Sequence, residues 1–240
     1  MRAVLITAGQ VVFALFLYAV GTVVLALAIF PGAMFCYLTW QQTAAYAMWA
    51  RVLVFCLALV AAYFLHGLVL IVLVGALRVL CRLNLKEAEY PIVSLGAAKW
   101  FLINALQTLV SITFMDFILL TPFASLFYRL MGAKLGRNVQ INSKFCADIS
   151  LLEIGDGSVI GGHATVIGHS FERDKLILKK VKIGRHVVVG LNAVILPGAE
   201  IGDRALIAAG AVVPKNMRIA PKIVYLGPQA DSAKGLGIGS

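Results

Sequence analysis

The chain has 240 residues, of which 61% are hydrophobic and 13% are charged, and its formal net charge is +10. A soluble domain is about half apolar and about a quarter charged, so these values exclude a single water-soluble globule. Residues 1–130 contain 7 Lys and Arg and 3 Asp and Glu, whereas residues 131–240 contain 14 and 8. The chain is therefore predicted to have a membrane-embedded N-terminal half and a soluble, moderately basic C-terminal half.

The positive charge fits three kinds of partner: nucleic acid, an anionic lipid surface or an anionic small ligand. The basic residues of the second half have neither zinc-ligand spacing nor a cluster of stacking aromatic residues, so we expect no nucleic-acid partner. Lipid headgroups or a phosphorylated ligand fit a membrane protein better. The four Cys residues are scattered without a CxxC pair, so we expect neither a metal site nor a disulfide framework.

Two apolar runs, residues 3–30 and 52–77, contain no Asp, Glu, Lys or Arg, and each is long enough to cross a bilayer. The first closes at Pro31-Gly32 and is too long for the apolar core of a signal peptide. The segment 31–50 carries no charge, whereas basic residues follow the second run: Arg78, Arg82 and Lys86. The positive-inside rule therefore places both ends of this hairpin in the cytoplasm.

A third apolar stretch, residues 101–130, contains several polar residues and a proline and has basic residues on both sides. A full crossing is disfavoured, and we predict interfacial or re-entrant helices over 97–130. His66 and Asp116 are ionisable groups at or near membrane depth, which is a hint of function. A hydrogen bond between helices, or an Asp that caps a helix, is the interpretation that we favour for both.

A six-residue repeat runs through the second half of the chain. Ile or Val recurs at seven consecutive positions of this period: Ile183, Val189, Ile195, Ile201, Ile207, Val213 and Ile219. Earlier blocks carry the same anchors at Leu135, Ile141, Ile154, Ile160 and Val166. A period of six fits neither an α-helix nor a lone strand. It predicts a coil of triangular cross-section, with one strand and one corner in each hexapeptide.

The third residue after each anchor falls at a corner of this coil. Apart from Arg204, these positions hold residue types that tolerate a left-handed backbone: Gly157, His163, His169, His186, Asn192, Gly198, Gly210 and Asn216. The anchors then fill the interior, and adjacent coils stack at a strand spacing of about 4.8 Å.

On these features the segment from Ile154 to Lys215 resembles the hexapeptide-repeat acyltransferases. The resemblance rests on Ile154-Gly155-Asp156, on the region of His169 and above all on the stretch NAVILPGAEIGDRALIAAGAVVPKN. It implies a left-handed parallel β-helix over residues 131–226, followed by a tail over 227–240, and assembly as a homotrimer. The order of helices over 1–96, then TPFASLFYRLMGAKLGRN, then the β-helix also resembles the membrane-bound terminal domains of some non-ribosomal peptide synthetases.

Acyl transfer from a thioester needs a base that takes the proton of the acceptor, and histidine suits this task near neutral pH. The family resemblance assigns this role to His169, because in the family a His just before an excursion from the coil acts as the base. Val166 to Ile183 spans 17 residues, one short of three repeats, so we predict an irregular segment over 170–176, with the phase restored at Ile177. Irregular segments on rigid scaffolds often carry sites.

Within this irregular segment, Glu172 and Asp174 are candidates to orient or charge-stabilise the imidazole. His163 and His186 are interpreted as turn residues that replace Asn. If 17 residues complete a coil, however, His169 and His186 share a corner on adjacent coils, which makes His186 a candidate neighbour of the site.

The resemblance also implies that the acyl-CoA lies along the coils between neighbouring subunits. By position it assigns Gly190, Ala209 and Lys215 to this contact, with Lys215 near the nucleotide phosphates. Pro214 stands where the family usually has Thr, which removes a hydroxyl and a backbone donor. The basic run at 179–185 fits either phosphates or a solvated or lipid-facing charged face.

We therefore expect an inner-membrane acyltransferase whose cytoplasmic β-helix moves an acyl group, most simply acetyl, from acyl-CoA. The acceptor is expected to be a hydroxyl or amine of a membrane-held molecule such as a glycolipid or lipid-linked saccharide, since tethering raises effective concentration. One alternative is an amide-forming transferase that uses a carrier-protein thioester. A second alternative is a non-catalytic trimeric membrane scaffold. No permanently bound cofactor and no metal are expected.

Overall fold

The computed structural model describes residues 2–228, with side chains from residue 7 onward. They form two compact units, each described by itself. The first comprises residues 1–83 and 101–114, and the second comprises residues 84–100 and 115–240. Helix α3 (Leu95–Thr113) contributes residues to both units. The predicted tail lies outside the described residues from position 229 onward.

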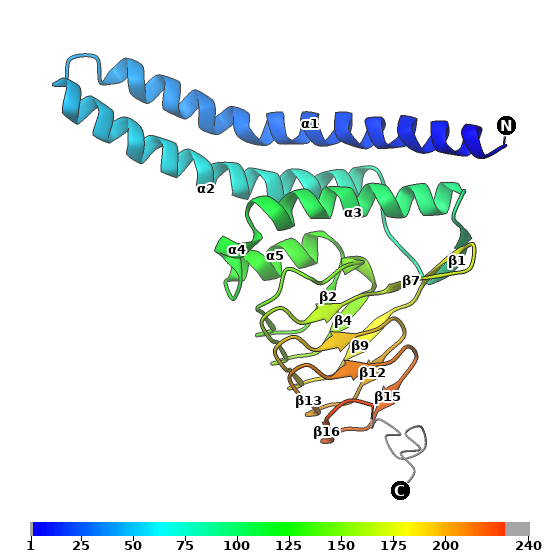
Figure 1. Ribbon diagram of the computed structural model, residues 1–240. Helices are drawn as coiled ribbons and strands as arrows, with labels where there is room; N and C mark the ends of the chain where they lie inside the picture. Colours follow the sequence, from blue (N-terminus) through cyan, green and yellow to red (C-terminus); the bar gives the residue numbers. More distant parts are fainter. Residues whose placement is uncertain (1, 229–240) are drawn as a thin grey trace, which may run out of the picture. The chain divides into compact units, whose positions relative to one another are not determined.

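The first unit is a helical hairpin of α1 (Arg2–Gln42) and α2 (Met48–Leu80), together with most of α3 (Figure 1). The expectation that the first helix closes at Pro31-Gly32 is wrong, because α1 continues through Pro31 to Gln42. Gly32 instead allows a close approach to α2, since a Cβ added there would lie 2.9 Å from the carbonyl oxygen of Ala62. The pair Pro31-Gly32 therefore marks a helix contact and not a helix end.

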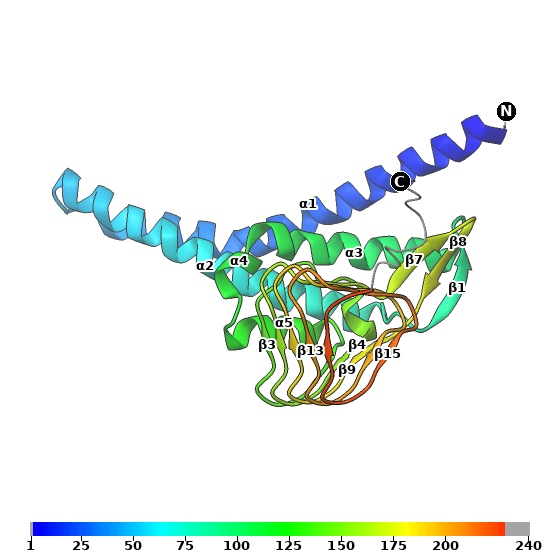
Figure 2. The ribbon, with the colours of Figure 1, turned by 60° about the horizontal axis from the view of Figure 1, so that its bottom comes forward.

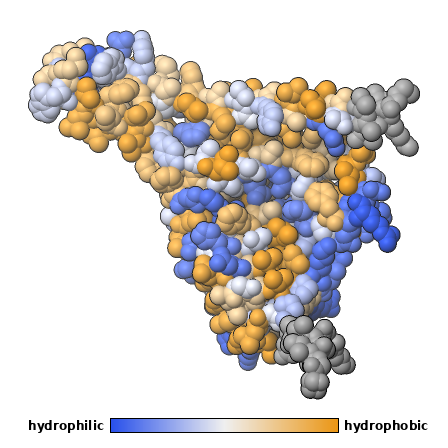
Figure 3. Space-filling model, viewed as in Figure 1, coloured by the Kyte–Doolittle hydropathy of each residue, from blue (hydrophilic) through white to orange (hydrophobic). Residues whose placement is uncertain are grey.

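Three helical segments are long and apolar enough to cross a membrane by length and composition: Thr7–Gln42, Met48–Leu80 and Leu95–Thr113. Both predicted crossings fall in the first two. The third segment lies in the stretch that we predicted to be interfacial or re-entrant. Apolar residues predominate on the visible faces of α1 and α2, with hydrophilic residues at the turn between the two helices (Figure 3).

The second unit begins with a strand and three helices that lead into a β-helix: β1 (Ala88–Pro91), the start of α3, α4 (Met115–Ile118) and α5 (Pro122–Leu130). Thr121 caps α5, because its side chain accepts a hydrogen bond from Phe123 N, and Pro122 occupies the first turn, where no donor is needed. The Tyr128 hydroxyl donates to the Ser143 carbonyl over 3.0 Å and attaches α5 to the first coil. Asp116 lies in the first turn of α4 and forms an ion pair with Lys144 at 2.6 Å, which is neither the hydrogen bond between helices nor the cap hydrogen bond that we favoured.

The rest of the second unit is a parallel β-helix, seen from the side in Figure 1 and turned toward the viewer in Figure 2. Its strands form three parallel sheets, in the orders β15-β12-β9-β4-β2, β16-β13-β10-β5-β3 and β14-β11-β6. The short strands and one 3-10 turn are β2 (Lys134–Leu135), β3 (Gln140–Ile141), η1 (Ile149–Leu151), β4 (Leu152–Ile154), β5 (Val159–Ile160), β6 (Thr165–Val166), β9 (Val181–Ile183), β10 (Val188–Val189), β11 (Val194–Ile195), β12 (Glu200–Ile201), β13 (Leu206–Ile207), β14 (Val212–Val213), β15 (Arg218–Ile219) and β16 (Val224–Tyr225).

The six-residue repeat is confirmed as the rule that builds these coils. Every anchor from Leu135 to Ile219 is buried. The predicted corner residues have a left-handed backbone, including Arg204 with φ of 60°, but His169 is not among them. Among the predicted corner positions, all of which lie in the described part of the chain, only the predicted base lacks this conformation.

At His169 the coil is interrupted by a β-hairpin, β7 (His169–Glu172) and β8 (Lys175–Leu178). Strand β1 pairs with β8 to make a three-stranded antiparallel sheet that projects from the coils (Figure 2). The expectation of an irregular segment with the phase restored at Ile177 is wrong. Leu176 and Leu178 are the buried residues of β8, and the coil resumes at Val181.

Candidate active site

The hairpin replaces the third corner of the second coil. In the coil before it, the left-handed corner residue is Asp148, with φ of 54°. In the two coils after it, this corner is made by Gly198 and Asn216. The hairpin closes at its base through Lys179 N, which donates to the Gly168 carbonyl over 2.7 Å. His169, the first residue of the hairpin, therefore lies one coil above Asp148.

Asp148 and His169 form the central pair of the candidate site. His169 Nδ1 lies 2.5 Å from Asp148 Oδ2. The Asp148 side chain is 0% exposed and the His169 side chain 22% exposed, so the carboxylate is sealed from water and the imidazole is not. Since a carboxylate only accepts, Nδ1 carries the proton and the lone pair is on Nε2.

Two further donors hold the buried carboxylate. Gly168 N donates to Asp148 Oδ2 over 3.0 Å, and the Trp100 indole donates to Asp148 Oδ1 over 2.6 Å. The Trp100 ring also packs edge-on against His169 at 4.7 Å and against Phe171 at 5.5 Å between ring centroids. A buried charge is tolerated when its hydrogen bonds are made, and here both carboxylate oxygens have donors.

The carboxylate beside the imidazole of His169 is that of Asp148, and not that of Glu172 or Asp174 as expected. Glu172 accepts hydrogen bonds from Lys215 Nζ at 2.8 Å and from Ser170 at 3.1 Å. The hydrogen bond from Lys215 lowers the pKa of the Glu172 carboxyl. Asp174 lies in the turn of the hairpin, at the opposite end from His169, where its carbonyl accepts from Ile92 N.

Asp148 was missed because it precedes the excursion instead of lying in it. A signal was present, since Ile141 and Ile154 are 13 residues apart and two repeats span only 12. This slip of one residue accommodates the turn that buries Asp148.

The predicted stacking of His186 on His169 is wrong. The coil that contains the hairpin is longer than 17 residues, since Thr165 pairs with Val194 of the next coil. His186 lies instead at the first corner, where its ring contacts Gly157: a Cβ added to Gly157 would lie 2.6 Å from His186 Nδ1. His163 and His186 both have left-handed backbones, which agrees with their interpretation as turn residues.

The residues assigned to the acyl-CoA fall into two groups. Gly190 and Ala209 lie against each other on adjacent coils, because a Cβ added to Gly190 would lie 2.5 Å from Ala209 N. The close approach of the adjacent coil is thus a sufficient reason for a glycine at position 190, and no ligand is needed to explain it. Lys215 lies at the third corner, next to the hairpin, in its ion pair with Glu172.

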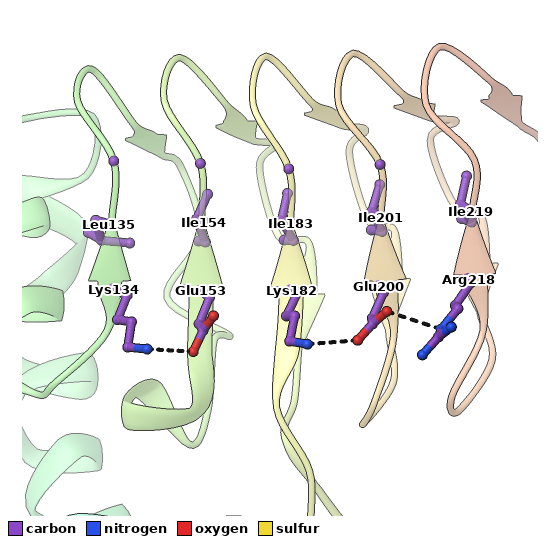
Figure 4. A pocket seen from close by; sticks show the side chains of 14 residues that line it. Lys134, Leu135, Glu153, Ile154, Lys182, Ile183, Glu200, Ile201, Arg218 and Ile219 are labelled. Atoms are coloured by element: carbon purple, nitrogen blue, oxygen red, sulfur yellow. Dashed lines mark hydrogen bonds and ion pairs between the residues drawn. The ribbon is translucent and has the colours of Figure 1, made fainter.

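The basic run after the hairpin is largely neutralised. On the outer face of the sheet β15-β12-β9-β4-β2, charges alternate along a row of Lys134, Glu153, Lys182, Glu200 and Arg218 (Figure 4). Lys182 pairs with Glu200 at 2.8 Å and Lys180 with Glu153 at 3.2 Å. Hydrogen bonds from Lys134 and Lys182 lower the pKa values of Glu153 and Glu200 respectively. The groove of 680 Å³ on this face is lined by this row of paired charges.

Residues 180–215 match the family model of the bacterial transferase hexapeptide, which describes six repeats. YvoF of Bacillus subtilis, a protein classed as an acetyltransferase, is 32% identical over 104 residues, 40% of this chain and 60% of that protein. The repeat in the second half of the chain is thus the hexapeptide repeat that this family model describes, and the resemblance to hexapeptide-repeat acyltransferases that the sequence predicted is confirmed.

Two further proteins that resemble this chain have different names. The galactoside O-acetyltransferase of Escherichia coli is 32% identical over 106 residues, 38% of this chain and 51% of that protein. The delta-poly-L-ornithine synthetase of Acinetobacter baumannii is 25% identical over 117 residues, 49% of this chain and 9% of that protein. The chain spans about half of the length of the acetyltransferases and a small part of the synthetase.

A solved hexapeptide-repeat acetyltransferase of Vibrio cholerae, complexed with acetyl coenzyme A, matches 38% of this chain and 52% of that chain. The identity is 28% and the TM-score 0.35.

Proposed function

We propose that this protein is a membrane-anchored acyltransferase that moves an acetyl group from acetyl-CoA to a hydroxyl or amine of a membrane-associated acceptor. The observation that carries the proposal is the Asp148–His169 pair at the interrupted corner of the β-helix. A buried carboxylate on Nδ1 leaves Nε2 of a partly exposed imidazole as a base. A domain of the acyltransferase family supplies the reaction class.

In the proposed reaction, His169 Nε2 takes the proton of the acceptor hydroxyl while its oxygen attacks the thioester carbonyl carbon. The resulting tetrahedral intermediate collapses as the carbon–sulfur bond breaks. The departing thiolate takes the proton from the imidazolium, so the products are the acetyl ester and free CoA thiol. During the first step Asp148 stabilises the positive charge on the imidazole, as a carboxylate does for a histidine base.

For the donor, we propose that the acetyl-CoA phosphates approach Lys215, and that Gly190 and Ala209 line the path of the pantetheine. The 2.8 Å ion pair between Lys215 and Glu172 is partly exposed, so an incoming phosphate can compete for the ammonium group. A flexible point charge on a long stem suits this exchange.

For the acceptor, we propose a glycolipid or lipid-linked saccharide in the inner membrane. The apolar helices α1 and α2 and the basic residues after α2 support an integral membrane protein with the β-helix in the cytoplasm, with α3 interfacial or re-entrant as we predicted. The similarity to a galactoside O-acetyltransferase favours a sugar hydroxyl over an amine. Anchoring would hold enzyme and acceptor at one surface.

We also propose a homotrimer, as the family resemblance implies. Val188, Leu206 and Val224 are exposed on the outer face of the sheet β16-β13-β10-β5-β3 and form an apolar stripe that a second copy could cover. Light scattering on the purified protein tests this: the wild type is expected to have three copies and Leu206→Glu fewer. A monomeric wild type would contradict it.

The experiment that tests the activity measures transfer of radiolabelled acetyl from acetyl-CoA into a bacterial lipid extract by protein in vesicles. His169→Ala is expected to lose about 10²-fold or more, whereas the matched variant His186→Ala stays within about twofold of the wild type, like other surface changes. Release of the label by mild base then identifies an ester, and resistance identifies an amide. Full transfer by His169→Ala would contradict the assignment.

A second candidate function is amide formation from a carrier-protein thioester. Two observations favour it: the similarity to a delta-poly-L-ornithine synthetase, and Pro214, which lacks the N–H and hydroxyl expected beside the donor. Calorimetry with CoA separates the candidates, because only the first requires CoA to bind. Absence of CoA binding and of lipid labelling, together with absence of amide formation from a carrier-protein thioester, would favour a scaffold without activity.

A further inference from the structure

The hydrogen bonds of Asp148 divide unequally between its two oxygens. Oδ2 accepts from Gly168 N and faces His169 Nδ1, and both of these residues belong to the start of the hairpin. Oδ1 accepts from the Trp100 indole, over 2.6 Å. Since the Asp148 side chain is 0% exposed, water cannot take the place of this indole donor.

Trp100 also fixes the plane of the imidazole. Its ring lies edge-on to His169, with 4.7 Å between centroids and an interplanar angle of 64°. Trp100 itself is 7% exposed and lies on α3, outside the six-residue repeat. One side chain therefore contacts both members of the pair, and it comes from a part of the chain that a β-helix alone does not contain.

We propose that Trp100 is a positioning residue for the base: its indole N–H holds Asp148 in the orientation that faces His169 and sets how tightly Asp148 holds the Nδ1 proton. The proposal rests on the proposed function for its meaning in catalysis. The effect on the imidazole itself does not depend on any substrate.

The expected change in the basicity of His169 follows from how hydrogen-bond donors stabilise the negative charge of Asp148. With the indole donor present, the negative charge of Asp148 is stabilised at both oxygens. Without it, Oδ2 is the better acceptor and holds the Nδ1 proton more firmly, which makes the imidazole more basic. His169 then stays protonated to a higher pH and is unable to act as a base over that range.

The test is the pH dependence of His169 modification by diethyl pyrocarbonate, which attacks neutral imidazole, followed by peptide mass spectrometry. In Trp100→Phe the half-modification pH of His169 is expected to rise by about one pH unit. His186 in the same digest is the internal reference and is expected not to move. An unchanged His169 midpoint would overturn the proposal.

Two further variants separate the N–H from the ring. Replacement of Trp100 by β-(3-benzothienyl)alanine, with Trp40 and Trp49 changed to Phe, substitutes sulfur for the N–H and keeps the shape, so the same rise is expected even if Trp100→Phe folds poorly. Phe171→Leu removes a ring from the same cluster without removing a donor to Asp148 and is expected to leave the midpoint in place. An equal rise in Phe171→Leu would overturn the proposal, because packing would then explain the effect.

Acetyl transfer gives the second readout. At neutral pH Trp100→Phe is expected to lose about tenfold in kcat with little change in KM for acetyl-CoA, and to recover much of this loss as the pH is raised. A loss that is equal at every pH would mean a merely structural role. If neither protein labels lipid, the proposed function fails while the diethyl pyrocarbonate result still decides the role of Trp100.

Discussion

His186 and His169 have the same side chain and lie in the same β-helix, but at corners of different construction. At the first corner the repeat closes, His186 has φ of 54°, and its ring contacts Gly157 of the preceding coil. At the third corner the repeat opens into a hairpin, and a buried carboxylate lies 2.5 Å from His169 Nδ1. The residue type is shared, so the break in the repeat is what places a carboxylate beside one histidine and not beside the other, and we attribute the proposed role of His169 to this difference.

The largest expected effect concerns the open corner. Asp148→Asn keeps the size of the side chain but removes the charge that stabilises the imidazolium, so transfer is expected to fall about 10²–10⁴-fold. The matched change at the closed corner, Asp156→Asn, alters an exposed pair with Arg137 and is expected to have little effect. Steady-state rates of lipid labelling measure the effect of each change. Equal effects would contradict the difference that we propose between the two corners.

The next effect concerns the regular coils, where buried apolar side chains stabilise the fold. Ile195 is 0% exposed in β11, so Ile195→Ala is expected to cost about 2–5 kcal/mol by leaving a cavity. Thermal unfolding of the purified protein measures this loss. The pH profile of transfer by the fraction that stays folded is expected to match the wild type, and a shifted profile would argue that core and site are coupled.

A smaller effect is expected at the edge of the open corner. Lys215→Gln removes the cation that we assign to the donor phosphates, so KM for acetyl-CoA is expected to rise about three- to tenfold at similar kcat. Lys182→Gln is the control, because Lys182 pairs with Glu200 on the row of alternating charges. The assignment of Lys215 fails if both variants raise KM equally.

The smallest effect is the dependence of β-helix stability on acid. Lys182 lowers the folded-state pKa of Glu200, and Lys134 that of Glu153. A lowered pKa means that these pairs contribute stability above the unfolded value of about 4.3, and that this stability is lost as the pH falls through the folded-state values. The melting temperature is expected to fall below about pH 4 in the wild type, and less steeply in Glu200→Gln. An identical slope in both would contradict this.

The fold of the β-helix was predictable because its rule is local. Each anchor from Leu135 to Ile219 is apolar for the same reason, and each corner needs a residue that tolerates positive φ, so one sequence reveals the period. The place of His169 at the start of the hairpin was predictable from a break in that period, whereas its role as the base stays a prediction. The same argument fails for Glu172, because a residue close to His169 in sequence need not lie close to its imidazole. Glu172 is the last residue of β7, where it forms an ion pair with Lys215.

The rest of the site depends on contacts that no local pattern records. Trp100 and Asp148 are separated by 48 residues and lie in different kinds of structure, a helix and a corner. In the sequence, the residues of β1 look like part of a connecting segment. In the structure they pair with β8, and Glu89 forms an ion pair with Lys175 at 3.0 Å. Hydropathy separates an apolar N-terminal half of the chain from a more polar C-terminal half. These contacts join residues of one half to residues of the other, so hydropathy does not predict them.

The pairing of β1 with the hairpin has a consequence for how this domain can be inherited or cut. A fragment that starts at residue 131 keeps every coil of the β-helix, yet it leaves behind both the third strand of the hairpin sheet and the indole donor to Asp148. Recombination at the boundary between the apolar and the more polar half, near residue 131, would transfer the β-helix without β1 and Trp100. A fragment that carries the whole site has to include β1, which starts at Ala88 in the segment that follows α2.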